Sequence, residues 1–268
     1  MRPAWSELFD PATLTSVRPF PQGITREWAW GGADGSGVDV AVIDSGVDAD
    51  HPLVGAVTSA VAMSYDPDEE DGVRRVEGPH QDLFGHGTAC AGIVRAVAPQ
   101  CRLHSIRVLG ERLTGKGLVF AAGLEWAIDH GFRVVNLSLS TGKEDYFALF
   151  HELADRAYFA NVMLVCAVNN VPAPSYPSQY ASVFSVAAHD RHDPFGIDYN
   201  PRPPVEFGAP GIDVTVAWKG GGTIVTTGNS FAAPHVAGLI ARLLSKHPGL
   251  TPFHVKTVLH AVADNATA

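Results

Sequence analysis

Residues 226–238 read TTGNSFAAPHVAG, and this stretch decides the fold expected for the chain. A glycine-marked loop leads into a run of alanine and glycine, whose small side chains let neighbouring elements approach closely. Pro234 is tolerated there because the first N–H groups of a helix have no intrahelical partner. We expect a buried helix that begins at Ser230. That serine is either an ordinary N-cap or a nucleophile at the positive end of a helix.

Composition narrows the class of protein. The chain has 268 residues with 46% apolar content, enough for one large core. Its formal net charge of −9 argues against a nucleic-acid-binding surface. Three cysteines, an odd number, cannot form a full disulfide framework. We see neither a signal peptide nor an apolar run of membrane-spanning length, so we expect a cytoplasmic protein without a membrane partner. A secreted mature form and the oligomeric state stay open.

Short β-branched runs alternate with helical patterns along the chain. This alternation predicts an α/β fold: a doubly wound, mostly parallel sheet with helices on both faces, in a single domain. We divide the chain into an N-terminal extension, 1–27, and a catalytic domain, 28–268. Strands are expected at residues 38–43, 103–108, 134–139, 162–168 and 183–187, helices at 88–94, 118–130, 146–159 and 252–262, and polar loops at 64–75 and 189–204.

Polar residues stand where the expected strands end and the expected helices begin. Asp44 ends the first strand, His86 lies between two glycines at a helix start, and Asn169 follows a later strand. Sites in parallel sheets gather at the carboxyl ends of the strands. Taken singly, each residue has an ordinary structural role as a turn former or helix-end residue. Together with Ser230 they supply an acid, a base, a nucleophile and an amide donor.

The chain resembles the subtilisin-like serine proteases, the subtilases. The resemblance rests on AVIDSGVDADHP around Asp44, GHGT around His86 and GNSFAAPHVAG around Ser230, in that order, and extends from about residue 28 to residue 262. It also includes LEWAI, VVNLSLS and YPSQY. The resemblance implies a serine endopeptidase with a subtilisin-like fold that acts on a peptide or protein substrate.

The resemblance also implies a role for each site residue. Ser230 would attack the peptide carbonyl, His86 would act as base and Asp44 would orient the imidazole. The Asn169 side chain and the Ser230 N–H would bind the oxyanion. The family frame A-A-G-N aligns with residues 166–169, which favours Asn169 over its neighbour Asn170. The substrate-binding walls would be Ser138, Leu139, Ser140, Thr141, Ala167 and Val168.

Several positions depart from the family pattern. Asn229 and Phe231 flank the nucleophile where threonine and methionine are usual. Val168 stands where the family has glycine, so we expect a narrow pocket that favours small or slender side chains. Cys90 lies four residues after His86, on the same helix face, at a place where proteinase K-type subtilases carry a free cysteine. We favour a packing role for Cys90 over a chemical one.

No cofactor and no metal site are expected, although calcium stays possible. Many subtilisins bind calcium in a longer loop after the histidine helix, and residues 92–110 are too short to contain it. The acidic run from Asp66 to Asp71 is more typical of a solvated loop. Residues 17–24 would either lie across the active site or pack on the surface as an ordinary arm.

Two questions about function stay open. The protease could degrade proteins broadly, or it could process one precursor peptide and ignore casein. The alternative from another class is a catalytically silent peptide-binding module, against which the complete set of Asp44, His86, Ser230 and Asn169 argues.

Overall fold

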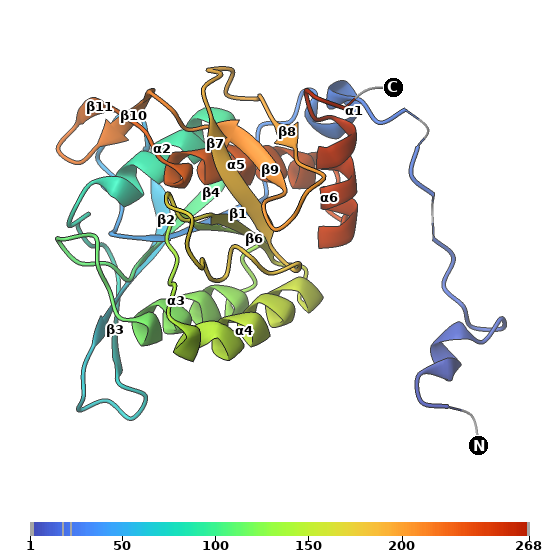
Figure 1. Ribbon diagram of the computed structural model, residues 1–268, viewed down its shortest axis with the longest axis horizontal. Helices are drawn as coiled ribbons and strands as arrows, with labels where there is room; N and C mark the ends of the chain where they lie inside the picture. Colours follow the sequence, from blue (N-terminus) through green and yellow to red (C-terminus); the bar gives the residue numbers. More distant parts are fainter. Residues whose placement is uncertain (1–2, 18, 22, 267–268) are drawn as a thin grey trace.

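The computed structural model describes residues 3–17, 19–21 and 23–266. A nine-stranded sheet in the order β3-β2-β4-β1-β5-β6-β7-β9-β8 forms its centre (Figure 1). Neighbouring strands from β2 to β9 run parallel, and β3 and β8 pair antiparallel at the two edges. The strands are β1 (Asp39–Asp44), β2 (Val57–Tyr65), β3 (Val73–Glu77), β4 (Arg102–Arg107), β5 (Val134–Leu137), β6 (Met163–Ala167), β7 (Phe184–His189), β8 (Asp198–Tyr199) and β9 (Phe207–Pro210). A separate hairpin joins β10 (Val214–Trp218) to β11 (Gly222–Thr226).

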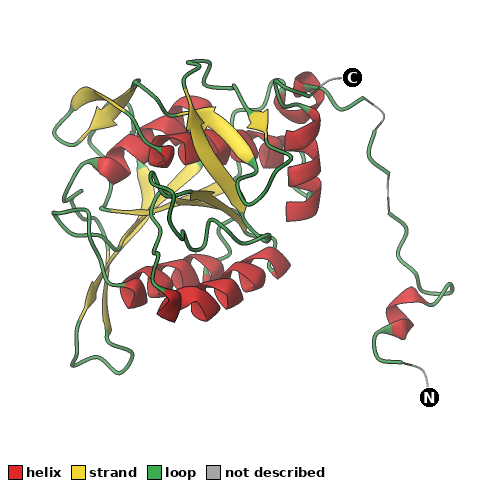
Figure 2. Ribbon diagram, in the orientation of Figure 1, coloured by secondary structure: helices red, strands yellow, loops and turns green. Residues whose placement is uncertain are grey.

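Helices cover both faces of the sheet (Figure 2). One face carries α2 (His86–Val97) and α5 (Asn229–Lys246), and the other carries α3 (Gly117–Asp129) and α4 (Phe147–Phe159). The remaining helical segments are α1 (Arg26–Trp30), α6 (Pro252–Ala261) and the short 3-10 turns η1 (Ser6–Phe9) and η2 (Glu144–Tyr146). This arrangement is the doubly wound α/β fold that the alternation of strands and helices predicts. No helix in the described part of the chain is both long and apolar enough to span a membrane.

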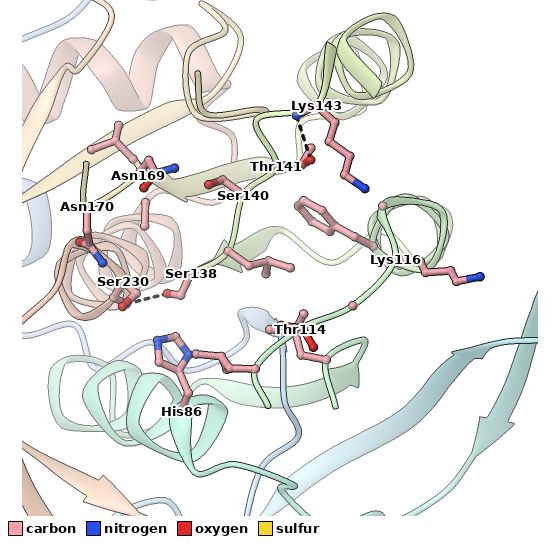
Figure 3. Close-up of a pocket in the computed structure, with 18 residues that line it drawn as sticks. His86, Thr114, Lys116, Ser138, Ser140, Thr141, Lys143, Asn169, Asn170 and Ser230 are labelled. Atoms are coloured by element: carbon pink, nitrogen blue, oxygen red, sulfur yellow. Dashed lines mark hydrogen bonds between the residues drawn. The ribbon is translucent and has the colours of Figure 1, made fainter. Parts of the chain in front are cut away.

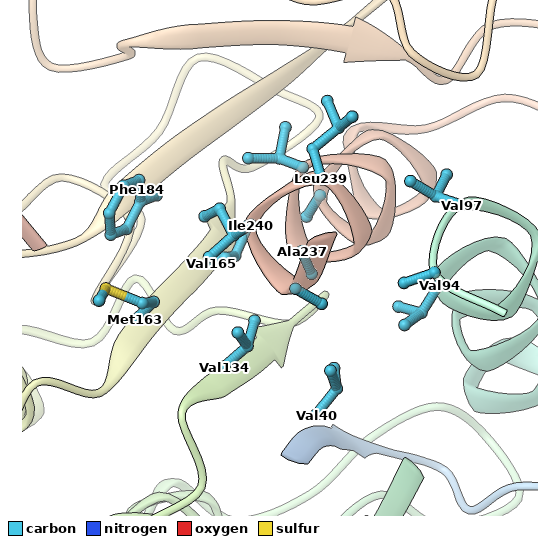
Figure 4. Close-up of a cluster of buried hydrophobic side chains, with 14 of the residues drawn as sticks. Val40, Val94, Val97, Val134, Met163, Val165, Phe184, Ala237, Leu239 and Ile240 are labelled. Carbon is cyan, nitrogen blue, oxygen red and sulfur yellow. The ribbon is translucent and has the colours of Figure 1, made fainter. Parts of the chain in front are cut away.

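Strand β1 shows why the central strands are continuously apolar. Val40 and Val42 pack toward α2 and α5, whereas Ala41 and Ile43 pack toward α3 and α4. Successive side chains point to opposite faces, so a strand covered on both sides needs apolar residues throughout. In Figure 4, valines from neighbouring strands lie beneath Ala237 and Ile240 of α5.

The small residues of α5 bring it close to α2. A Cβ atom at Gly238 would lie 2.6 Å from Cβ of Val97 on α2, too near for any side chain. All residues from Phe231 to Ala241 are buried. The expected buried helix is therefore present, and its small side chains let the two site-bearing helices pack against each other.

The two expected loops are only partly correct. Residues 64–75 form the tip of a hairpin made by the ends of β2 and β3, and within it Arg74 pairs with Asp66 at 2.7 Å and Arg75 with Asp71 at 2.6 Å. Residues 189–204 contain the short edge strand β8. β3 and β8 are the two edge strands of the sheet, and β3 is mostly exposed while β8 is half-buried. Their sequences therefore lack the apolar signal of the central strands.

The N-terminal arm leaves the body of the protein (Figure 1). Closer to the core, the ring of Phe20 packs edge-on against His254 of α6, with ring centroids 5.0 Å apart. At Phe20 the arm therefore packs on the surface helix α6 and not across the cleft. Arg18 and Gln22 of the same segment lie outside the described residues, and the boundary between the extension 1–27 and the domain 28–268 stays a prediction.

Candidate active site

The fold brings Asp44, His86 and Ser230 together. Asp44 is the last residue of β1, His86 is the first of α2, and Ser230 lies in the first turn of α5. Because α2 and α5 pack on the same face of the sheet, their N-termini meet the carboxyl end of β1. His86 and Ser230 line one cleft of about 430 Å³ (Figure 3).

Asp44 fixes the orientation of the His86 ring. Its two carboxylate oxygens each lie 2.9 Å from Nδ1 of His86, and Asp44 is fully buried. An N–H at Nδ1 donated to this carboxylate leaves Nε2 as the atom that can accept a proton. Among the described residues, no hydrogen bond joins the His86 ring to the Ser230 hydroxyl. Such catalytic hydrogen bonds are often long before substrate binds.

The environment of His86 sets its basicity. Burial lowers its pKa, but the negative charge and hydrogen bond of Asp44 outweigh burial and hold the pKa well above its usual value. Burial raises the pKa of the Cys90 thiol, which keeps it neutral around pH 7, so the charge of Asp44 is the main cause. His86 therefore holds its proton to a higher pH than an ordinary histidine does.

The buried carboxylate of Asp82 holds the start of α2. It accepts hydrogen bonds from Gly85 N at 2.8 Å, from Thr88 N at 2.9 Å and from the Thr88 hydroxyl at 2.6 Å. The Ser45 hydroxyl, next to Asp44, also donates to Asp82 at 2.8 Å. Asp82 therefore ties the helix of the base to the strand of the acid. Asp82 was not predicted from the sequence, because it lies three residues before the N-cap residue Gly85 and outside the usual capping position.

Asn229 holds the start of α5. Its side-chain amide donates to the carbonyls of Val168 at 3.2 Å and Asn169 at 3.1 Å, and its side-chain oxygen accepts from Ala188 N at 2.8 Å. Its own N–H donates to Oδ1 of Asn170 at 2.9 Å. Asn229 is therefore a positioning residue that locks the loop before Ser230 onto the strand ends beside it. From the sequence Asn229 was expected only to replace the usual threonine.

The structure places every expected substrate-binding residue in the cleft. Besides Asn169 and Asn170, the lining includes Ser138, Leu139, Ser140, Thr141, Ala167 and Val168. Oδ1 of Asn169 accepts from Val171 N at 3.2 Å, which leaves its NH₂ group as a donor for the cleft. The Ser138 hydroxyl donates to the Ser230 carbonyl at 2.7 Å and fixes the backbone of the nucleophile from the opposite wall.

Cys90 lies directly beneath the acid and base. Its Sγ is 3.9 Å from Nδ1 of His86, 3.8 Å from Asp44 and 3.6 Å from the Ser230 carbonyl, and the residue is fully buried. Potential ligand atoms of Asp44, His86 and Cys90 lie within 4.8 Å of one another. A thiophilic metal ion suits such a set, but binding it would take both the base and its orienting acid away from proton transfer.

Comparisons with known proteins agree with this geometry. Residues 35–268 match the model of the subtilase family. The chain is 30% identical over 267 residues to the thermostable alkaline protease of Halalkalibacterium halodurans, covering 94% of this chain and 70% of the relative. It is 32% identical over 247 residues to subtilisin E of Bacillus subtilis, covering 87% and 62% of the two chains. The crystal structure of a cold adapted subtilisin-like serine proteinase superposes with a TM-score of 0.66 at 27% identity, covering 87% of this chain and 86% of that one.

The fold and the cleft define a class of serine hydrolases, in which an aspartate, a histidine and a serine, in that order along the chain, gather at one end of a mostly parallel sheet. The chain belongs to the subtilase family of serine endopeptidases.

Proposed function

We propose that the chain hydrolyses peptide bonds through an acyl-enzyme formed on Ser230. The observation that carries this proposal is the buried Asp44–His86 pair at the cleft wall that Ser230 shares. Nε2 of His86 takes the Ser230 proton as the hydroxyl attacks the carbonyl carbon. The same proton then passes to the leaving amine, and a water molecule hydrolyses the ester by the reverse sequence. Asp44 stabilises the imidazolium formed in each half-reaction.

The oxyanion needs donors on the opposite side of the attacked carbonyl. We assign the Asn169 side chain and the Ser230 N–H to this task. Supporting the choice, Asn169 lines the cleft and its Oδ1 accepts from Val171 N, so that its NH₂ group has no partner among the described residues. Asn170 also lines the cleft and uses its Oδ1 for Asn229 N, so the choice between the two rests on the family frame at residues 166–169.

A protease with a narrow substrate range, which processes one precursor peptide, is the more specific version of this proposal. Val168 on the cleft wall supports it, because a branched side chain removes volume that a large substrate side chain needs. A silent peptide-binding module is not favoured, because the acid–base pair, the serine and the amide donor all remain at one cleft. Digestion of casein and of a peptide library, read by mass spectrometry, separates general from dedicated proteolysis.

Covalent labelling tests the mechanism. A fluorophosphonate should label Ser230. Ser230→Ala should abolish labelling and lower kcat by about six orders of magnitude, because the members of such a triad act as a unit. Asn169→Ala should lower kcat by roughly a hundred- to a thousandfold, with Asn170→Ala as the matched control. A folded Ser230→Ala enzyme that keeps a few per cent of activity contradicts the assignment. A larger loss in Asn170→Ala than in Asn169→Ala exchanges the roles of the two asparagines.

A calcium-free enzyme is part of the same proposal. The connection from α2 to β4 comprises only residues 98–101, and two of its carbonyls, of Pro99 and Cys101, accept hydrogen bonds from Arg95 at 2.8 Å. The residues at this place therefore do not fit a calcium site, because a guanidinium group engages the oxygens that a calcium ion would need. The expected cytoplasmic location gains no support from the relatives and stays a prediction.

A further inference from the structure

The charge of the cleft differs from the charge of the chain. The whole chain carries a formal net charge of −9, with 28 acidic and 19 basic residues. The residues that line the cleft nevertheless include Lys116 and Lys143 and no aspartate or glutamate. A locally positive cleft in an acidic protein attracts anionic groups and repels cationic ones.

The two lysines lie at one end of this cleft. Figure 3 shows Lys116 and Lys143 on the side away from His86 and Ser230, with Thr141 beside Lys143. The segments that carry the two lysines pack together through Tyr146 of η2, because a Cβ atom at Gly117, next to Lys116, would lie 2.6 Å from the Tyr146 ring. The buried ring of Phe120 also lines the cleft and gives it an apolar surface.

Only one of the two ammonium groups is free to bind a new partner. Nζ of Lys116 lies 3.0 Å from the centroid of the Tyr65 ring, so its charge is partly engaged in a cation–π contact. Lys143 is exposed, and no ion pair engages its ammonium group within the described part of the chain. The neighbouring Glu144 and Asp145 are exposed and do not line the cleft.

We propose that Lys143, assisted by Lys116, selects substrates that carry an aspartate or glutamate two to four residues before the cut bond. This inference rests on the proposed function and on the resemblance to subtilases, which implies that residues 138–141 form the wall on the acyl side of the substrate. Lys143 follows that wall by two residues, so its ammonium group meets side chains on the acyl side, beyond the one next to the cut bond. An extended peptide advances about 3.3 Å per residue, which places these side chains toward the far end of the cleft.

Matched peptides test the proposal without depending on turnover. The probes are fluorescently labelled tetrapeptides of alanine with one Glu or one Gln at the second, third or fourth position before the cut bond. Fluorescence anisotropy measures the Kd of each peptide for the Ser230→Ala protein, which cannot hydrolyse it. At one position Glu should bind roughly fivefold more tightly than Gln, the scale of a single partly exposed ion pair. High salt should reduce this ratio.

Charge variants assign the effect to the lysines. Lys143→Ala should bring the Glu/Gln ratio close to one, Lys143→Arg should preserve it, and Lys116→Ala should reduce it less. Lys219→Ala removes an exposed positive charge that does not line the cleft, and it should leave the ratio intact. Equal Kd values for Glu and Gln at all three positions, or a ratio insensitive to Lys143→Ala, overturn the proposal.

Kinetics on the active protein separate this inference from the proposed function. The p-nitroanilides of the same tetrapeptides should show the Glu preference in kcat/KM. Selective binding of the Glu peptides together with no hydrolysis of any peptide contradicts the proposed function and supports the role of Lys143. Hydrolysis together with no Glu preference in Kd or kcat/KM leaves the proposed function standing and contradicts the role of Lys143.

Discussion

The two ends of helix α2 are held by opposite charges. At its N-terminus the Asp82 carboxylate accepts backbone N–H bonds from Gly85 and Thr88. Near its C-terminus the Arg95 guanidinium donates to four backbone carbonyls, those of Val54, Ala56, Pro99 and Cys101, at 2.8–3.0 Å. Each charge complements the helix dipole at its own end. Asp82 satisfies N–H groups at the start of the helix itself, whereas Arg95 binds carbonyls of the segments that adjoin the helix end.

The two ends of α2 differ in role: one end positions a residue of the site, and the other attaches the helix to neighbouring loops. The N-terminal end positions His86 against Asp44, so changes there should affect the rate of catalysis. The C-terminal end fastens α2 to the loops before β2 and β4, so changes there should affect the stability of the fold. The helix thus separates a catalytic end from a structural end, and variants at each end test this separation.

The largest expected effect is at the catalytic end. Asp44→Asn should lower kcat by about four orders of magnitude, because an amide cannot hold His86 in the active tautomer. Wild-type activity requires neutral His86 and should rise with pH through its raised pKa. Without the charge of Asp44 that pKa falls, so the acidic limb of the kcat/KM profile should move to lower pH. An unmoved limb would show that Asp44 does not set the basicity of His86.

The catalytic end also shows how far the sequence could lead. The positions of Asp44, His86, Ser230 and Asn169 could be predicted because each stands at a strand end or helix start inside a recognisable motif, and their catalytic roles stay predictions. The central parallel strands and their helices were equally predictable, because burial on both faces imposes long apolar runs.

The polar supports and the sheet edges carry weaker signals. Asp82 and Asn229 act through backbone groups that only the fold brings near them, and nothing in their spacing identifies those partners. The hairpin of β2 and β3 was missed because its exposed, ion-paired tip resembles a solvated loop. A binding role for Lys143 could not be predicted from the sequence, because only the fold places this lysine in the cleft.

The next effect is at the structural end. Arg95→Met keeps much of the aliphatic stem but removes the charged hydrogen bonds to four carbonyls, and it should lower the free energy of unfolding by about 2–3 kcal/mol. In a domain of this size that corresponds to a Tm lower by roughly 4–12 °C. Measurement in a Ser230→Ala background avoids self-digestion. In the active protein at low temperature, kcat should stay near the wild-type value, and a large fall in kcat would break the separation of the two ends.

A smaller effect is expected one turn into α2, at Cys90. Serine is only slightly smaller than cysteine, and its hydroxyl can still donate to the Ser230 carbonyl. Cys90→Ser should therefore change kcat/KM less than tenfold and the free energy of unfolding by about 1 kcal/mol. A mercurial should inactivate the wild-type enzyme, because the thiol lies beneath His86, and it should leave Cys90→Ser active. A folded but inactive Cys90→Ser protein would give the thiol a chemical role and contradict the packing role.

The smallest expected effect is that of calcium, and it tests the structural end most directly. Arg95 already engages the carbonyls of Val54, Ala56, Pro99 and Cys101, so chelation should leave Tm and activity nearly unchanged. In Arg95→Met these oxygens become free, but they are all carbonyls: among the described residues Arg95 donates to no carboxylate, and calcium prefers sites with carboxylate ligands. Added calcium should therefore fail to restore the Tm of Arg95→Met.

Two outcomes would contradict this prediction. If the Tm of the wild-type protein rises with calcium concentration, a calcium site lies elsewhere, and the acidic tip between β2 and β3 is the first place to mutate. Rescue of the variant alone would show that the guanidinium group and a calcium ion can serve the same end of the helix.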